Sequence, residues 1–453
     1  MAESIHRQLF RLAWPIIGLN VLQVMMLGVD SALCGRMANP QPVLAALGYS
    51  IQVVFLLMVA MLGLTVGTVA LVARAYGGGD TQRLNHLLVQ ATQLTVVVGI
   101  VVGIAGALGA EHILLALDAS PEVAKIGADY LRPLMAGTPF FYLTLLYAGI
   151  LRGVGNTRIP FLVALGTNVI NAVLNYGLIL GNLGMPALGV TGSAIGTVVA
   201  QASGVVALVM VLRSGKVPNL KLPLHLRAVD HQLAVELFRV GWPAAIDLLV
   251  LNVGFLTALA MLGRIDQVSV AAHGLGLRVQ SFAFVPGIGI AQATGAMVGQ
   301  ALGGSNVPRA KAVARASILL CLAIMTALAI AIFATGPLLV QVFDVMPDTK
   351  LGDYTIVWLQ ILAVAMPPAA INMALIGLLQ GAGATRTSLR INIWATIAIQ
   401  VPVALVLGFG FDLGEIGVWW SFPIGFAAKA VLNYVELKRE RWAVTGVRMS
   451  KKV

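Results

Sequence analysis

Two acidic side chains lie deep in apolar segments, and of all the residues in this sequence they are the best suited to chemistry. Asp30 lies inside the apolar run 9–37, and Asp247 lies in the segment PAAIDLLVLN. An ionised carboxylate in hydrocarbon costs roughly 2.5–3.5 kcal/mol on insertion scales, so a chain keeps one only where it faces a partner, a cavity or an ion. We therefore expect Asp30 to bind and release a proton or a cation.

Carboxamide side chains gather in a second apolar segment, 159–181. Asn171 and Asn175 are four residues apart, so they share one face of a helix, and Asn168 lies three residues before Asn171. Amide and carboxylate oxygens are suitable ligands for a hard cation such as Na⁺. The same groups could instead hold a carboxyl proton by hydrogen bonds, or could only join neighbouring helices.

The composition is that of a membrane protein. The chain has 453 residues, of which 59% are hydrophobic and 10% charged, and its mean hydropathy is +0.92. Soluble globular chains are about 25% charged. The apolar segments are longer than the ~9–11 residues of a barrel strand, which predicts an all-α polytopic membrane protein. Cys34 and Cys321 form no disulfide framework and no metal-ligand spacing.

The apolar segments predict twelve transmembrane helices. Their expected ranges are 9–35, 44–76, 84–110, 122–151, 159–181, 189–213, 237–262, 269–302, 311–342, 353–380, 391–410 and 417–437. The first is too long for the core of a cleavable signal peptide, so we expect it to be retained.

The basic residues predict the orientation of the chain. With a cytoplasmic N-terminus, Arg278 falls inside a helix and 23 of the 29 basic residues, Lys429 among them, fall on the cytoplasmic side. Only five fall on the outer side, namely Arg36, Lys125, Arg132, Arg264 and Lys350. This asymmetry favours cytoplasmic termini in a bacterial inner membrane. It also explains the net charge of +11 without any binding of nucleic acid.

The two halves of the chain resemble each other at an offset of 226–228 residues. The matching pairs include LFRLAWP (9–15) with LFRVGWP (237–243), AYGGGD (75–80) with ALGGSN (301–306), and LRGVGNTR (151–158) with LQGAGATR (379–386). Six helices per half predict two six-helix bundles related by a pseudo-two-fold axis along the membrane normal, with the substrate between them. We expect an N-terminal lobe (1–213), a cytoplasmic linker (214–236), a C-terminal lobe (237–437) and a basic cytoplasmic tail (438–453).

The repeat does not extend to the acids. It pairs Asp30 with Ala258 and Asp247 with Leu19, so we expect different chemistry in the two halves. Arg278 could bind an anion or pair with Asp247, and we favour the pair, whereas His273 is expected to be structural. Pro15 interrupts helical hydrogen bonding 15 residues before Asp30, so it is a candidate hinge that would respond to protonation of Asp30.

The sequence resembles the multidrug and toxic compound extrusion (MATE) transporters over nearly its whole length. The matching segments are WPIIGLNVLQVMMLGVDSALCGRM, LRGVGNTRIPF, NAVLNYGLILG, GVTGSAIGT and VAAHGLGLRVQSFAFVPGIGIAQATGAMVGQALGG. The resemblance implies two six-helix bundles that form a V around a central cavity. It also implies a secondary active antiporter that exports cationic, amphipathic or aromatic compounds in exchange for H⁺ or Na⁺.

The resemblance also implies a cation site in the N-terminal lobe, which carries over to Asp30, Asn171, Asn175 and Thr197. Na⁺ could bind at the first three of these residues, although some family members have a second Asp where this chain has Asn175. Two acids that other members carry in the C-terminal lobe correspond to Leu251 and Ala369, which argues against a cation site there. Asp247 lies one turn from Leu251 and could partly substitute. With one carboxylate in the N-terminal lobe, we favour H⁺ over Na⁺.

Three other functions fit the sequence less well. A flippase for lipid-linked oligosaccharide would need cationic groups for a pyrophosphate, and only Arg278 is a candidate. An intramembrane enzyme is not expected, because no catalytic motif is present, and a channel would not need two equivalent bundles. We expect a monomer in membrane lipid with no cofactor apart from the coupling ion. Candidate cavity residues, chosen by polarity alone, are Gln52, Tyr147, Gln280, Asn372 and Asn392.

Overall fold

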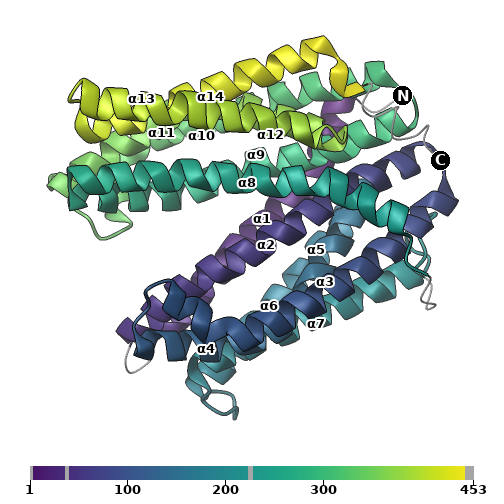
Figure 1. The fold of residues 1–453 in the computed structure, drawn as a ribbon, viewed down its shortest axis with the longest axis horizontal. Coiled ribbons are helices and arrows are strands. Elements are labelled where there is room, and N and C mark those ends of the chain that lie inside the picture. Colours follow the sequence, from purple (N-terminus) through teal and green to yellow (C-terminus); the bar gives the residue numbers. More distant parts are fainter. Residues whose placement is uncertain (1–3, 36–39, 223–227, 444–453) are drawn as a thin grey trace. The chain divides into compact units, whose positions relative to one another are not determined.

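The computed structural model describes residues 4–35, 40–222 and 228–443, and every regular element in these ranges is a helix (Figure 1). Ten of the helices are long and apolar enough to cross a membrane, and a bent helix pair makes an eleventh span. The last helix, α14 (Gly414–Arg439), has 26 residues and is therefore about 39 Å long, but it is less apolar. The expected all-α polytopic membrane fold is confirmed.

The chain forms two compact units, which we call the N-terminal unit (Gly18–Gly241) and the C-terminal unit (Met1–Ile17 and Trp242–Val453). Helices α1 (Ile5–Cys34) and α8 (His231–Ile265) each contribute to both units. The N-terminal unit also contains α2 (Pro40–Gly77), α3 (Thr81–Ala116), α4 (Pro121–Ala136), α5 (Thr138–Gly153), α6 (Arg158–Leu180) and α7 (Gly189–Arg213). The C-terminal unit also contains α9 (Gln267–Gly303), α10 (Val307–Gln341), α11 (Lys350–Gly381), α12 (Thr385–Ile393), α13 (Val401–Leu405) and α14.

The units exchange the first turns of their leading helices. Leu9 and Ile16 of α1 lie in the core of the C-terminal unit, whereas Leu233 and Leu237 of α8 lie in the core of the N-terminal unit. These turns correspond to each other in the sequence repeat. The expected lobes 1–213 and 237–437 stay a prediction, and the expected linker and tail lie partly outside the described residues.

Glycines allow both exchanged turns to pack closely. A Cβ on Gly289 of α9 would lie 2.5 Å from a side-chain carbon of Ile17. A Cβ on Gly67 of α2 would lie 2.7 Å from the carbonyl oxygen of Leu237. Since α2 and α9 correspond in the repeat, each unit packs the helix start that it receives against the equivalent helix.

The repeat is preserved in the local hydrogen bonds as well. Before α3, the side chain of Asp80 accepts a hydrogen bond from the Arg83 amide at 2.9 Å. Before α10, Asn306 accepts from the Arg309 amide at the same distance. The preceding residue has a positive φ in both turns, +72° at one and +55° at the other. The motifs AYGGGD and ALGGSN therefore form the same helix start.

The segment 122–151, expected as one helix, is two helices, α4 and α5, bent by 53° at Gly137. Pro139 lacks the N–H that would donate to the Met135 carbonyl, so the helix is interrupted there. This carbonyl faces α3, where a Cβ on Gly103 would lie 2.6 Å from its oxygen. The expectation of a continuous helix was wrong because Pro139 removes a backbone hydrogen bond of the helix, and Gly103 of α3 leaves room for the freed Met135 carbonyl.

The expected helix 391–410 is interrupted by wider turns. It consists of the end of α12, a π-helix η1 (Trp394–Gln400), α13 and a second π-helix η2 (Val406–Gly410). In the first wide turn the amide of Val401 donates to the carbonyl of Thr396, five residues earlier. Pro402 follows directly, and its ring would clash with a carbonyl four residues back in a regular α-helix. Short π segments often mark functional sites.

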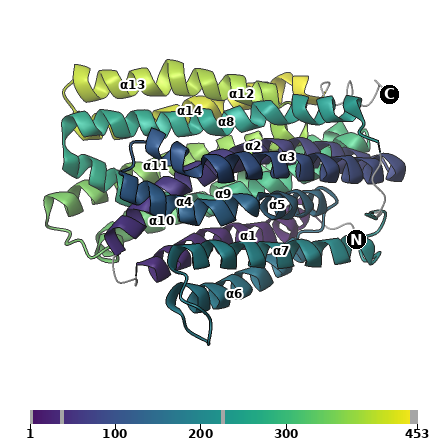
Figure 2. The same cartoon turned by 60° about the horizontal axis from the view of Figure 1, so that its bottom comes forward.

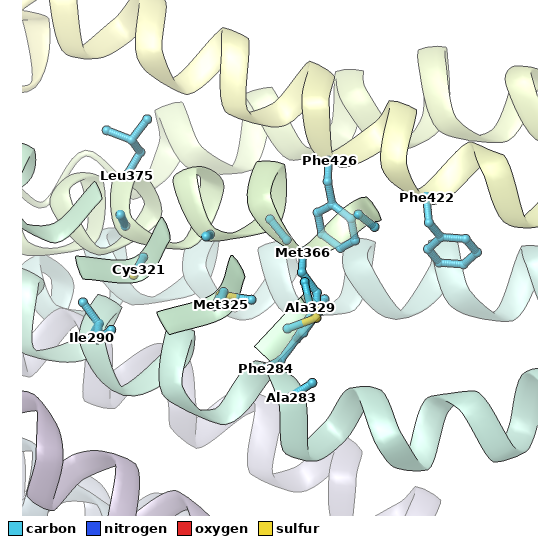
Figure 3. Close-up of a cluster of buried hydrophobic side chains, with 14 of the residues drawn as sticks. Ala283, Phe284, Ile290, Cys321, Met325, Ala329, Met366, Leu375, Phe422 and Phe426 are labelled. Atoms are coloured by element: carbon cyan, nitrogen blue, oxygen red, sulfur yellow. The ribbon is translucent and has the colours of Figure 1, made fainter. Parts of the chain in front are cut away.

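Large apolar side chains fill the C-terminal unit. Figure 3 shows Phe284, Met325, Met366 and Phe426 converging from α9, α10, α11 and α14. The two methionines are flexible enough to fill the spaces that the aromatic rings leave. This packing holds α14 next to the helices that carry the polar residues described below.

Candidate functional site

Asp30 lies in the part of α1 that belongs to the N-terminal unit. Its side chain is outside the described part of the structure, so its contacts stay a prediction. The other three residues of the expected cation site lie in α6 and α7 of the same unit. These two helices run side by side in both views (Figures 1 and 2).

Asn171, Asn175 and Thr197 form a buried hydrogen-bonded chain. Their exposed fractions are 1%, 0% and 4%. Asn175 Nδ2 donates to Asn171 Oδ1 at 3.4 Å, and Asn171 Nδ2 donates to Thr197 Oγ1 at 3.0 Å. The Thr197 hydroxyl then donates to the Ser193 carbonyl at 2.8 Å. The structure therefore joins the three predicted residues into one group, whereas Asn168 bonds only to its own helix.

Two glycines of α7 make this group possible. A Cβ on Gly196 would lie 2.1 Å from Asn175 Oδ1, and one on Gly192 would lie 2.4 Å from the Leu178 carbonyl oxygen. Small residues four apart let two helix backbones approach closely in a membrane. Here the same close approach brings the amides of α6 against the hydroxyls of α7.

The group is neutral and rich in oxygen. Such groups can hydrogen-bond to a protonated acid or coordinate a monovalent cation. Ser193, one turn before Thr197, adds a buried hydroxyl that has no hydrogen-bond partner among the residues described, and the sequence reasoning missed it. Within the described ranges no three Asp, Glu, His or Cys side chains form a group that could hold a metal ion.

Asp247 organises a second polar group, in the C-terminal unit. Its residue is 5% exposed. One carboxylate oxygen accepts from the Ser388 hydroxyl at 2.8 Å, and the other accepts from Asn392 Nδ2 at 2.8 Å. Thr396, in the first π-helix, donates to Asn392 Oδ1 at 3.3 Å. The sequence predicted Asp247 and Asn392 but not their contact, and it missed Ser388 and Thr396.

Lys429 of α14 supplies a positive charge to this unit. It is 2% exposed, and its ammonium lies 5.4 Å from the centre of the Phe426 ring. It forms no hydrogen bond or ion pair with the described residues, and its charge and that of Asp247 attract each other. The sequence reasoning assigned Lys429 to the cytoplasmic side, although its position inside the apolar run 417–437 was a signal for burial.

The expected pair between Arg278 and Asp247 is not formed. Arg278 is exposed on α9, and the carboxylate of Asp247 faces Ser388 and Asn392 instead. His273 is buried, with its ring 5.0 Å from Trp358 between ring centres, so it lies in an aromatic core.

The candidate cavity residues do not form one group. Asn372 accepts a hydrogen bond from Asn433 at 2.9 Å inside the C-terminal unit, where Gln280 is also buried. Gln52 is exposed on α2, and Tyr147 packs in the core of the N-terminal unit. Whether any of them contacts a substrate stays a prediction.

Pro15 lies inside α1, two residues before the last residue that α1 contributes to the C-terminal unit. Its repeat counterpart Pro243 lies in α8, two residues after the last residue that α8 contributes to the N-terminal unit. Both prolines therefore sit where a helix passes between units. The role of Pro15 as a hinge stays a prediction.

Comparison with known proteins gives a family assignment. The family model MatE matches residues 15–177 and 243–406, which together make up more than half of the chain. The two matches begin at Pro15 and Pro243, in agreement with the repeat.

Two curated bacterial proteins match along nearly their full lengths. The "Probable multidrug resistance protein NorM" of Thermotoga maritima is 26% identical, with 97% of this chain and 93% of the relative covered. The "Probable multidrug resistance protein YoeA" of Bacillus subtilis is 27% identical, with 95% and 93% covered.

Solved structures show the same fold. A crystal structure of MATE in the bent conformation matches with a TM-score of 0.90 at 22% identity and covers 99% of this chain and 98% of its own. A structure of MATE in the straight conformation matches with a TM-score of 0.89 at the same identity, with 98% and 97% covered. From the family model and these full-length matches, the chain belongs to the MATE family of membrane transporters.

Proposed function

We propose that this protein is a secondary active antiporter that exports cationic, amphipathic or aromatic compounds, including drugs, in exchange for H⁺. The relatives named as multidrug resistance proteins support this substrate class. The distribution of basic residues supports a bacterial inner membrane with both termini in the cytoplasm. We expect the protein to work as a monomer and to catalyse no reaction.

The observation that carries the proposal is the buried chain of Asn171, Asn175 and Thr197 in the N-terminal unit. Buried amides and hydroxyls in an apolar helix pair are costly unless they are bonded. They can favour a protonated Asp30 by accepting or donating hydrogen bonds, or they can contribute oxygens to a bound Na⁺. H⁺ is favoured because the site has one carboxylate, and Na⁺ is the other outcome of the test below.

Transport follows from exchange at Asp30. In the outward-facing state Asp30 takes up the ion, which changes how α1 contacts α6 and weakens binding of the drug. The loaded carrier turns inward, releases the ion and binds a new drug molecule. Coupling of this kind requires that ion and drug favour different states or compete for one site.

Asp247 is assigned a structural role. Both of its oxygens are hydrogen-bonded, and the charge of Lys429 attracts it within the same unit without forming an ion pair. Lys429 is also relevant to the flippase alternative, because it is a cationic group in addition to Arg278. A single ammonium that is 2% exposed is poorly suited to hold a pyrophosphate.

The test is ethidium efflux from proteoliposomes that contain the purified protein, with a proton gradient and a sodium gradient imposed separately. Asp30→Asn is the test variant, and Asp348→Asn is the matched control because Asp348 is exposed in a loop. We expect proton-driven efflux that Asp30→Asn abolishes and Asp348→Asn retains. Efflux driven only by the sodium gradient would identify Na⁺, and not H⁺, as the coupling ion.

Two results contradict the proposal. Full gradient-driven efflux by a folded Asp30→Asn protein would remove Asp30 from the coupling site. A folded protein that moves no cationic dye under either gradient would favour the lipid-linked oligosaccharide flippase instead.

A further inference from the structure

A groove in the C-terminal unit is lined by none of the residues of the two polar groups. It has a volume of about 490 Å³ and runs between the start of α1 and the start of α10. Ile5 and His6 line it on α1, and Lys311, Arg315 and Leu319 line it on α10. Ligand sites in proteins typically have volumes of about 300–1,000 Å³. The groove is therefore large enough for a small ligand, and it is lined by both apolar and basic side chains.

The charge of the groove is positive. Lys311 pairs with Glu440, which neutralises part of that charge. Arg315 forms no hydrogen bond or ion pair with the described part of the chain, and His6 forms none either. Arg309, nearby on α10, donates to Gln8 of α1, an uncharged side chain. The groove therefore presents a guanidinium that has no acidic partner.

The groove continues into an apolar helix face. Lys311, Arg315 and Leu319 are spaced four residues apart, so they follow one side of α10. Leu319 is 58% exposed, and further along the same helix Ile330 and Phe333 are also exposed. Exposed apolar side chains on a transmembrane helix face lipid. Arg315 thus lies at one end of this exposed apolar face of α10.

We propose that this groove binds the phosphate of an anionic phospholipid, with Arg315 as its main ligand and the acyl chains along the Leu319 side of α10. The positive-inside argument places the groove on the cytoplasmic side, where basic pockets between transmembrane helices bind anionic headgroups. A guanidinium suits a phosphate because its planar fork can donate two parallel hydrogen bonds. The site contacts both α1 and α10, so a bound lipid stabilises the exchanged start of α1.

The test compares lipid binding to the purified full-length protein in detergent. Native mass spectrometry counts retained phosphatidylglycerol, and thermal unfolding gives the shift that each lipid produces. Phosphatidylcholine is the lipid control, since it has the same phosphate and acyl chains without the net charge. Arg315→Gln is the test variant. Arg213→Gln is the matched control, because Arg213 is an exposed arginine at the end of α7, in the other unit.

We expect Arg315→Gln to lower the affinity for phosphatidylglycerol about tenfold, which is ~1.4 kcal/mol. Arg315→Lys should recover part of the affinity, and Arg213→Gln should change nothing. Equal binding of phosphatidylglycerol by the wild type and Arg315→Gln overturns the proposal. An Arg315-dependent shift produced equally by inorganic phosphate also overturns it, because the groove would then be a site for soluble phosphate.

Discussion

The two units carry polar groups of opposite character on equivalent scaffolds. In the N-terminal unit, Asn171, Asn175 and Thr197 form a neutral chain between α6 and α7. In the C-terminal unit, the carboxylate of Asp247 is held by Ser388 and Asn392, and the charge of Lys429 attracts it without an ion pair. The difference teaches that a buried acid alone does not identify a coupling site. An acid whose two oxygens already accept hydrogen bonds has less capacity left for a transported ion.

This comparison predicts opposite outcomes for the two acids. Asp30→Asn should abolish gradient-driven efflux with little loss of stability. Asp247→Asn should disturb the hydrogen bonds with Ser388 and Asn392 and remove the charge that attracts Lys429, which lowers stability by about 1–3 kcal/mol, while the folded fraction still transports. Thermal unfolding midpoints and proteoliposome efflux, measured on the same preparations, distinguish a loss of coupling from a loss of stability.

The double variant Asp247→Asn/Lys429→Met sharpens this prediction. Removing both charges should restore the unfolding midpoint most of the way to that of the wild type. If Asp247→Asn abolished efflux without lowering the midpoint, the comparison would be reversed and Asp247 would be the coupling acid.

A substitution that disturbs the packing around Asn171, Asn175 and Thr197 should have the next largest effect on efflux and stability. Gly196→Ala places a methyl group 2.1 Å from Asn175 Oδ1, so the Asn175 amide must move out of its hydrogen-bonded position, at a cost of about 1–3 kcal/mol. We expect slower efflux and a lower unfolding midpoint. Gly166→Ala on α6 is the control, because a Cβ there meets nothing within 4 Å. Similar losses in both variants would show that the effect is not specific to the Asn175 contact.

Single hydroxyl groups offer a finer comparison. Thr197→Val removes the acceptor of the Asn171 amide, and we expect the affinity for the coupling ion to fall about tenfold, or ~1.4 kcal/mol. Ser388→Ala removes a donor to Asp247 and should lower stability by about 1–2 kcal/mol without changing the ion dependence. Efflux rates measured over a range of ion concentrations test both. An altered ion dependence in Ser388→Ala alone would contradict the assignment.

The smallest expected effect is a loss of stability at acid pH, caused by protonation of carboxylates in loops outside the membrane. The hydrogen bond from Lys350 is the main cause that lowers the pKa of Asp266 to about 2, and the hydrogen bond with His86 lowers the pKa of Asp230. A carboxylate with a lowered pKa stabilises the fold above the unfolded pKa of about 3.9 and loses that contribution as the pH falls through its folded value. The stability contributed by Asp266 should therefore disappear between about pH 4 and pH 2.

Substitution of Lys350, the partner of Asp266, or of His86, the partner of Asp230, tests this loss of stability in each unit. Lys350→Ala should reduce the acid-dependent fall of the unfolding midpoint for the C-terminal unit, and His86→Ala should do so for the N-terminal unit. The effects are expected to be small, because both carboxylates are partly exposed. Lys125→Ala, an exposed lysine without a partner among the described residues, is the control. An identical acid transition in wild type and Lys350→Ala would exclude this ion pair as its source.

The membrane class, the repeat and most of the helical spans could be predicted from the sequence, whereas the break at Gly137 and the wide turns in 391–410 could not. Each successful prediction depends on patterns within one segment or between two similar segments. The turns AYGGGD and ALGGSN form the same cap because local hydrogen bonds decide a helix start. The asymmetry of the acids was also visible, since the repeat pairs Asp30 with Ala258.

The partners of the buried groups were decided only by the tertiary structure. Asp247 meets Ser388 across 141 residues of sequence, and no local pattern indicates that contact. Lys429 looked like a topology signal and is instead a buried charge, because packing of α14 rather than hydropathy determines where its side chain lies. The sequence by itself determined which polar residues enter the membrane. The fold decided which of them are already satisfied, since burial makes every unpaired charge or hydrogen-bonding group costly and so selects the packing that pairs them.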